Sequence, residues 1–203
     1  MSRTWPIYNT QPGWVLGFHG CDESVGKEVL NSDNLGLKKS EQDHDWLGSG
    51  VYFWQGSPAR AWDWAQKRRA AGRIKTPFVI GAIIDLKVCL DLFQQENLDL
   101  LAEVHSAFAH MQAKEGLDMP VNSGGTDDKA LRRLDCAVIE MAHRIRKAQV
   151  KTDPSISEFD SVRSPFYESG ELYEGAGISA KNHIQIAIRN PACIKGYFLP
   201  RVV

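Results

Sequence analysis

Hydrophobic residues recur along the chain in short runs near its two ends and in helical stripes in its middle. The run "WVLGFHG" at 14–20 is an apolar strand candidate, and "PFVIGAIIDL" at 77–86 is nearly continuous, as in a strand covered on both faces. Between them, "WLGSGVYFW" at 46–54 places two glycines and a serine directly before a short apolar strand. The first half of the chain therefore predicts three strands.

Two more strands are predicted toward the end of the sequence. The first is "FDSVRSPF" at 159–166. In the second, Ile184, Ile186 and Ile188 alternate with polar or small residues, the period-two pattern of a strand with one buried face. The segment "YESGELYEGAGISAKN" at 167–182 separates them and predicts a loop.

Helices are expected between these strands. "DESVGKEVL" at 22–30 has apolar residues at helical spacing and acidic residues in its first turn. Ser57 and Pro58 are an N-cap residue and a first-turn proline, and the helix that they begin runs to Gly72, a residue typical of a helix C-terminus. The charged stretch 31–45 predicts a loop.

The middle of the chain, at about 94–150, is predicted to be mainly helical. Two helical segments, 96–116 and 127–149, flank the turn-rich sequence "MPVNSGGT". The second segment has one apolar stripe, formed by Leu131, Leu134, Val138, Met141 and Ile145.

Together these elements predict an α+β fold in a single domain of residues 1–203. Strands and helices of unequal length follow one another without a regular β-α-β alternation. A chain of 203 residues is long enough to bury a sizeable core. Neither G-x-G-x-x-G nor G-x-x-x-x-G-K-[ST] occurs, which argues against a Rossmann or a P-loop site.

Composition narrows the class of protein. Hydrophobic residues make up 43% and charged residues 24%, and the net charge of -1 gives no overall attraction to nucleic acid or membranes. The sequence shows no signal peptide and no long apolar run, so a cytoplasmic protein with reduced thiols is expected. No zinc-site spacing and no metal are expected from the four scattered cysteines, Cys21, Cys89, Cys136 and Cys193.

Basic residues gather on the second helical segment of the middle region. Such a face is usually a solvated surface, and the alternative is contact with a nucleic acid or an acidic partner. The residues are Arg132, Arg133, Arg144, Arg146 and Lys147.

Three short motifs lie on or beside predicted strands: "FHG" at 18–20, "LGSGVYF" at 47–53 and "HIQIAI" at 183–188. In this order they resemble the ADP-ribosyltransferase superfamily, in particular its His-Tyr-[Glu/Asp/Gln] branch, which includes the poly(ADP-ribose) polymerases and the diphtheria-toxin-like enzymes. The helix predicted after the tyrosine strand is also typical in its placement. The resemblance implies a split β-sheet core with flanking helices and NAD as the substrate.

The resemblance also implies roles for particular residues. His19 would exchange a hydrogen bond with the adenosine ribose of NAD, and the backbone of Gly20 would pair with the nicotinamide carboxamide. Tyr52 would stack on the nicotinamide ring, because two flat rings make a favourable contact in a pocket that excludes water.

The turn before Tyr52 and the residue Gln185, which with His19 and Tyr52 makes up the expected triad, complete the site. Gly48, Ser49 and Gly50 would let the chain turn close beside the ligand. Gln185 stands where most active members have a glutamate that supports the oxocarbenium-like transition state. A neutral amide gives a weaker bond than a carboxylate, about 0.5–1.5 against about 1.5–3 kcal/mol. Glutamine can therefore orient the ribose without supplying charge.

A carboxylate from elsewhere is an alternative source of that charge. Glu168, Glu171 and Glu174 lie in the segment that related enzymes use to recognise the acceptor. They are either solvated or one of them activates the acceptor nucleophile. His183 lies two residues before Gln185, on the same side of the strand, and is a weaker candidate for a supporting role.

The resemblance implies an NAD-dependent mono-ADP-ribosyltransferase that modifies a protein or nucleic-acid acceptor. Compact members of this kind are often bacterial toxins or defence effectors, so an inhibitory antitoxin is an expected partner. The first alternative is a binding module for NAD, ADP-ribose or a protein on the same fold. The second is RNA 2′-phosphotransferase chemistry, whose branch has a second histidine where Tyr52 stands.

Overall fold

The computed structural model describes residues 13–124 and 131–201. In chain order the described elements are β1 (Val15–Asp22), α1 (Glu23–Leu30), β2 (Val51–Gln55), α2 (Pro58–Ala70), β3 (Pro77–Ile84), β4 (Cys89–Asp91), α3 (Gln95–Glu115), β5 (Asn122–Ser123), β6 (Leu131–Arg132), α4 (Arg133–Thr152), β7 (Ser161–Glu171), β8 (Ser179–Ile188), a 3₁₀ turn (Pro191–Cys193) and β9 (Ile194–Phe198).

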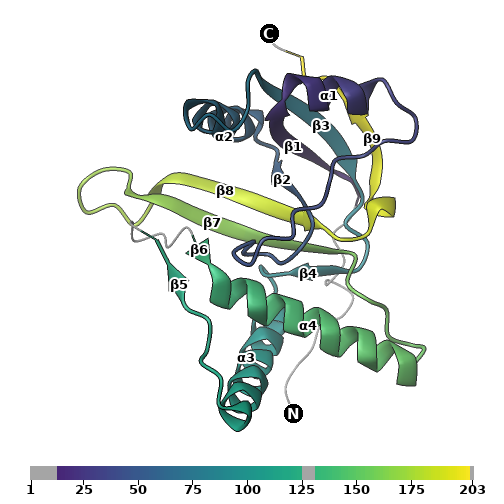
Figure 1. Ribbon diagram of the computed structural model, residues 1–203, viewed down its shortest axis with the longest axis vertical. Helices are drawn as coiled ribbons and strands as arrows, with labels where there is room; N and C mark the ends of the chain where they lie inside the picture. Colours follow the sequence, from purple (N-terminus) through teal and green to yellow (C-terminus); the bar gives the residue numbers. More distant parts are fainter. Residues whose placement is uncertain (1–12, 125–130, 202–203) are drawn as a thin grey trace.

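The described strands form one large sheet and one small ribbon (Figure 1). The large sheet has seven strands in the order β4-β7-β8-β2-β1-β3-β9, and only the β4–β7 pair is parallel. The small ribbon pairs β5 with β6. A mixed sheet with four α-helices agrees with the predicted α+β class.

The sheet opens between β1 and β2. Strand β1 pairs with β3 over all eight of its residues, but with β2 only at Gly17–Gln55 and Phe18–Trp54. Beyond Phe18 the backbones of β1 and β2 are no longer paired, and the His19 ring reaches across to the carbonyl oxygen of Tyr52. This opening lies in the middle of the sheet, between two well-paired halves.

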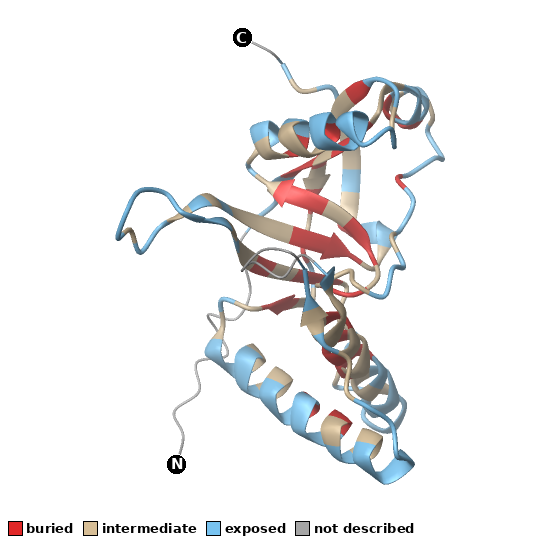
Figure 2. Ribbon diagram, turned by 60° about the vertical axis from the view of Figure 1, so that its left-hand side comes forward, coloured by how far each residue is buried: buried red, intermediate tan, exposed pale blue. Residues whose placement is uncertain are grey.

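Helices cover the two halves differently. Helices α1 and α2 lie against β1 and β3, whereas α3 and α4 pack together on the other side of β4 and β7 (Figure 1). A cluster that includes Leu47, Ile139 and Val162 connects α4 to the sheet. Burial is concentrated in the central strands, and the outward faces of α3 and α4 are exposed (Figure 2). The helical middle of the chain thus packs on the sheet through one apolar face.

The predicted loop at 167–182 is mostly strand. Strands β7 and β8 continue past the sheet as a two-stranded arm, with pairing out to Glu171–Ser179, so only residues 172–178 connect them (Figure 2). Glycine and glutamate have low strand propensity, but pairing between the strands supplies the backbone hydrogen bonds that propensity does not. The register shifts between Glu168 and Glu171, where Ser169 and Gly170 have positive φ angles.

Helix α4 begins later than its sequence pattern predicts. Residues 127–130 lie outside the described residues, Leu131 belongs to β6 with 37% of its surface exposed, and the helix starts at Arg133. The Asn122 side-chain oxygen accepts hydrogen bonds from the backbone N–H groups of Leu134 and Asp135. The cap comes from a distant residue, so the local sequence gave no sign of this start.

The other helix boundaries follow local chemistry. Asp22 caps α1 by accepting a hydrogen bond from the Ser24 N–H. Pro58 begins α2 as predicted, although the Ser57 side chain makes no capping hydrogen bond, and Gly72 follows the C-cap with a φ of +68°. None of the described helices is long and apolar enough to cross a membrane.

Three of the four cysteines are buried, and Cys89 is half-buried. All four are free thiols. Burial is the main cause that raises the pKa of Cys21, Cys136 and Cys193 to about 11 and that of Cys89 to about 12. They are therefore neutral core residues at physiological pH.

Gly20 is required by packing. A Cβ added there would collide with the carbonyl oxygen of Ala61 in α2 and press on the ring of Trp64. We expect Gly20→Ala to lower the free energy of unfolding by about 1–3 kcal/mol, because relieving the collision requires the backbone of β1 or of α2 to move. Urea unfolding measures this. Gly196→Ala, where the added Cβ meets nothing within 4 Å, should change stability little; equal effects of the two substitutions would contradict the packing argument.

Candidate active site

A cleft of about 730 Å³ lies where β1 and β2 separate. Its lining includes His19 from β1, Tyr52 from β2 and Gln185 from β8, three strands that are neighbours in the sheet. The structure therefore brings the three predicted triad residues together, although more than 130 residues separate Tyr52 from Gln185 in the chain. Its volume is in the range typical of small-molecule sites, about 300–1,000 Å³.

The position of His19 fixes its tautomer. Its Nδ1 lies 2.7 Å from the backbone carbonyl oxygen of Tyr52, and a carbonyl can only accept, so Nδ1 carries the proton. Burial lowers the pKa of His19, and this outweighs the opposing effect of the Tyr52 carbonyl. At neutral pH the ring is therefore uncharged, and Nε2 has a lone pair with which to accept a hydrogen bond.

The Tyr52 hydroxyl closes the turn that precedes it. It accepts a hydrogen bond from the Leu47 N–H at 2.9 Å and donates one to the Gly48 carbonyl at 2.8 Å. Burial, with help from the nearby Asp45 carboxylate, raises the pKa of this phenol above its ordinary value, so it stays protonated. The hydroxyl thus has a structural task, and the ring lines the cleft.

Gln185 is oriented by Trp46. The indole Nε1 of Trp46 donates to the Gln185 side-chain oxygen at 2.5 Å. An indole N–H can only donate, so it selects the amide oxygen and turns the amide nitrogen away. Within the described part of the chain that nitrogen has no protein acceptor. The N–H donors of Gln185 are therefore free for a ligand, and one of the two lone pairs of its oxygen is taken by Trp46.

An ion pair between Glu140 and Arg189 holds the turn that precedes Tyr52. Glu140 of α4 accepts hydrogen bonds from the Ser49 N–H at 2.6 Å and from Arg189 at 2.7 Å, and Arg189 also reaches the Ser49 carbonyl. Burial alone would raise the pKa of Glu140, but these two hydrogen bonds hold it below its ordinary value. A charged carboxylate and guanidinium thus fix the backbone before Tyr52.

The residues of the predicted glycine turn have different surroundings. Gly50 lines the cleft, and a Cβ there would lie 3.0 Å from the Ile188 carbonyl oxygen. Gly48 and Ser49 are not among the lining residues. Gly48 has a φ of +74° and faces the Glu140 carboxylate, where a Cβ would lie 2.7 Å from the oxygen. Gly20 likewise lies outside the lining, against α2.

Aromatic and cationic side chains complete the cleft. Trp46, Trp54 and Trp64 line it, and the rings of Trp54 and Trp64 are 5.9 Å apart. Three cationic residues, Lys38, Arg68 and Arg73, also line it, and the Arg68 guanidinium lies 5.3 Å from the Trp64 ring centre. Flat apolar faces beside several cations suit a ligand with planar rings and phosphates.

The acidic residues predicted near the acceptor lie on the arm. Glu168 pairs with Arg60 and Lys67 of α2, and Glu171 accepts a hydrogen bond from the Gly175 N–H. Glu174 is exposed in the connection between the strands. The three glutamates are not among the residues that line the cleft.

His183 lies between the Phe166 and Trp54 rings, at 5.2 and 6.3 Å. Burial, helped by Arg60, lowers the pKa of His183 to about 4. Both ring nitrogens are buried without a hydrogen-bond partner among the described residues, and so is the Trp54 Nε1. Of these two residues only Trp54 lines the cleft, so the His183 nitrogens are buried outside its lining.

The structure shows functional candidates that the sequence pattern did not single out. Trp46 orients Gln185 through a hydrogen bond. Glu140 accepts from the Ser49 N–H and so holds the turn before Tyr52. Trp64 and Arg68 are four residues apart on α2, so their spacing was a readable signal for one helix face. Nothing local linked Glu140 to Ser49, 91 residues away.

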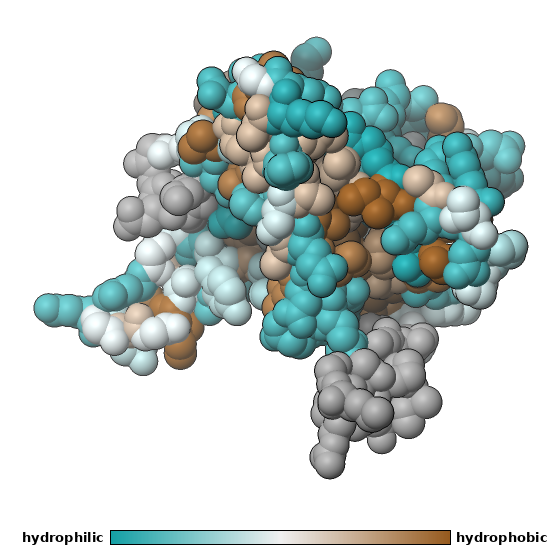
Figure 3. Space-filling view, turned by 90° about the horizontal axis from the view of Figure 1, so that it is seen from below, coloured by the Kyte–Doolittle hydropathy of each residue, from teal (hydrophilic) through white to brown (hydrophobic). Residues whose placement is uncertain are grey.

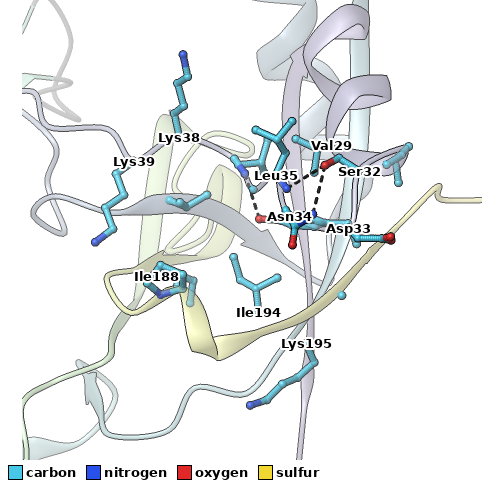
Figure 4. A pocket seen from close by; sticks show the side chains of 17 residues that line it. Val29, Ser32, Asp33, Asn34, Leu35, Lys38, Lys39, Ile188, Ile194 and Lys195 are labelled. Atoms are coloured by element: carbon cyan, nitrogen blue, oxygen red, sulfur yellow. Dashed lines mark hydrogen bonds between the residues drawn. The ribbon is translucent and has the colours of Figure 1, made fainter.

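Two of the other cavities lack this convergence of groups. One, of about 630 Å³, lies under the 31–39 segment against β9; its floor includes Ile188 and Ile194, and Lys38 and Lys39 extend away from it (Figure 4). The other, of about 290 Å³, is mostly apolar and lies between α3 and α4, beside which Figure 3 shows hydrophobic side chains around a hollow. The described residues contain no group of three or more acidic, His or Cys side chains arranged to hold a metal ion.

Scans against protein-family models, curated proteins and solved structures each found no match to this chain.

We expect Tyr52→Phe to loosen the turn while keeping the ring in the cleft. The change removes one hydrogen-bond partner from the Leu47 N–H and one from the Gly48 carbonyl, which should cost about 1–3 kcal/mol of stability. Chemical denaturation gives this value, and hydrogen exchange of the Leu47 amide should become faster. The control is Tyr167→Phe on the arm, where the residue is 61% exposed and the substitution should be nearly neutral.

Proposed function

We propose that this protein is an NAD-dependent mono-ADP-ribosyltransferase. The observation that carries the proposal is the meeting of His19, Tyr52 and Gln185 in one cleft at the opening of the sheet. These residues have the order and types of the His-Tyr-[Glu/Asp/Gln] branch that the sequence resembles. The aromatic and cationic lining supports a dinucleotide as the ligand.

In the proposed reaction the bond between nicotinamide and C1′ of its ribose breaks, and its electron pair stays on the nicotinamide nitrogen. The acceptor nucleophile forms a new bond to C1′, and its proton passes to water. The ribose carries positive charge in the transition state. The protein's task is to hold NAD, shield the reacting carbon and orient the ribose hydroxyls.

Each triad residue has a group suited to this task. The free Nε2 of His19 accepts from a ribose hydroxyl, and the Tyr52 ring gives a flat face for nicotinamide. The amide N–H groups of Gln185 donate to oxygens of the ligand, held in place by Trp46. Lys38, Arg68 and Arg73 supply positive charge for the pyrophosphate.

The orientation of Gln185 also supports a second function, a module that binds NAD or ADP-ribose with little turnover. Its oxygen already accepts from Trp46 and has no formal charge, so it stabilises the developing cation less than a carboxylate would. Calorimetry distinguishes the two functions. Saturable NAD binding without release of nicotinamide would favour the binding module.

Release of nicotinamide from NAD by the purified protein, with and without cell extract, tests the proposed transferase. We expect release, and we expect His19→Ala to reduce it at least tenfold, because the ribose loses a hydrogen-bond partner. Chromatography of the products measures it. His105→Ala, a change on α3 outside the cleft, is the matched control. Full activity in His19→Ala would contradict the assignment.

A negative charge in place of the neutral amide of Gln185 should change the rate of the reaction. Gln185→Glu keeps an oxygen for the Trp46 indole and adds a negative charge beside the reacting ribose. We expect it to raise the rate of nicotinamide release by roughly tenfold, since about 1.4 kcal/mol separates neutral from charge-assisted bonds. Gln185→Ala should lower the rate. A slower Gln185→Glu enzyme would show that the amide donors are what the reaction needs.

A further inference from the structure

A second polar cavity, which we call the α4 pocket, has a volume of about 490 Å³. Its lining from α4 is Glu140, His143, Arg144 and Lys147, whose spacing places them on one face of the helix. The lining is completed by Lys39, by residues 158–160 before β7 and by residues 189–190 after β8. None of these residues lines the cleft, so the α4 pocket is separate from the site proposed for NAD.

Contacts within the protein hold the wall of the α4 pocket in place. Arg146 of α4 donates to the Ser157 carbonyl at 2.8 Å, and its guanidinium lies 4.9 Å from the centre of the Phe159 ring. The Asn190 amide donates to the Asp160 carboxylate, which ties the segment before β7 to the segment after β8. The pocket is therefore already shaped before any ligand binds, which lowers the cost of ordering on binding.

Most of the negative charge in the α4 pocket is already engaged, whereas most of its positive charge is not. The Glu140 carboxylate pairs with Arg189, and the Asp160 carboxylate accepts from Asn190. His143 adds no charge, because burial, helped by Arg189, lowers its pKa to about 4. Within the part of the chain that the structure describes, four charged lining side chains form no ion pair or hydrogen bond: Lys39, Arg144, Lys147 and Glu158. Three unpaired cations thus face one unpaired carboxylate.

Two of these cations lie next to each other on α4. Arg144 and Lys147 are three residues apart, so their Cβ atoms are about 5–6 Å apart and their like charges repel. Both side chains are exposed and can reach a ligand. Lys39 also extends away from the 630 Å³ cavity beside it (Figure 4). An anion between these side chains would replace the repulsion by attraction, and a guanidinium can bind it with two parallel N–H groups.

We propose that the α4 pocket binds a small phosphate monoester through Arg144, Lys147 and Lys39. A phosphate monoester has a charge of about −1.5 to −2 at pH 7, so it matches the excess of unpaired cations better than a single carboxylate does. The pocket volume lies in the range of small-molecule sites, about 300–1,000 Å³, which leaves room for the body of the ligand. The inference does not depend on the proposed function, because binding is read without NAD.

Calorimetry with ribose 5-phosphate as the probe tests this binding. We expect saturable binding that weakens as the salt concentration rises, and no binding of ribose, which lacks the phosphate. The double variant Arg144→Ala/Lys147→Ala should bind ribose 5-phosphate at least about tenfold more weakly, because two charge-assisted contacts are lost. Both side chains are exposed, so the variant should fold normally, which circular dichroism checks.

Two further double variants locate the bound phosphate. Arg69→Ala/Lys114→Ala removes the same residue types from exposed positions outside the cleft and the α4 pocket, and it should bind like the native protein. Arg68→Ala/Arg73→Ala removes two cations from the cleft and should keep the binding that Arg144→Ala/Lys147→Ala loses. Binding that is lost only with the cleft cations would place the phosphate in the cleft and overturn the inference.

Removal of the one unpaired carboxylate gives a test of the opposite sign. Glu158→Gln should bind ribose 5-phosphate about twofold to fivefold more tightly, the range of an exposed charge pair. Affinity at or below the native value would contradict the assignment. So would an absence of saturable binding to the native protein, or equal losses in Arg144→Ala/Lys147→Ala and its Arg69→Ala/Lys114→Ala control. A single-stranded oligonucleotide that binds through Arg144 and Lys147 where ribose 5-phosphate does not would also overturn it, by assigning these cations to a polymer.

Discussion

The hydrogen bond between the His19 ring and the Tyr52 carbonyl joins the two halves of the sheet just beyond their last backbone pair. Strands β1 and β2 share two residue pairs and then separate, so backbone pairing ends at the mouth of the cleft. The imidazole replaces the missing backbone partner for one carbonyl. A buried carbonyl without a partner is costly, and this bond removes that cost while it fixes which nitrogen of His19 faces the cleft.

The separation of β1 and β2 also determines how the segment before β2 is held in place. With β2 free of β1 along one edge, the segment before it is held by other groups: the Tyr52 hydroxyl from inside the turn and the Glu140–Arg189 pair from α4 and the end of β8. Helix α4 thus has a role at the site although its residues lie far from His19 in the sequence. The same packing explains why glycine stands at position 48, where the carboxylate leaves no room for a Cβ.

Electrostatics in this protein are local. The net charge of -1 gives no overall attraction to polyanions, yet the cleft is lined by three cations, Lys38, Arg68 and Arg73, and by three tryptophans. On α4 and just before it, three of the basic residues noted in the sequence make separate contacts. Arg132 lies over the Trp46 and Phe166 rings, Arg133 pairs with Asp43, and Arg146 donates to the Ser157 carbonyl. Tertiary contacts therefore decide which cations remain available to a ligand.

Hydrophobic periodicity by itself determined most of the secondary structure. It placed β1, β3 and β8, helices α1 to α3, and the motifs that carry His19, Tyr52 and Gln185, because local spacing reports which face of an element is buried. It did not find the β7–β8 arm or the start of α4, since strand pairing and a cap from Asn122 came from residues distant in the chain. Only the tertiary structure decided that Gly20 packs on α2, that Trp46 turns the Gln185 amide, and that Glu168 binds Arg60. Such contacts form when separate segments meet, and no local pattern encodes them.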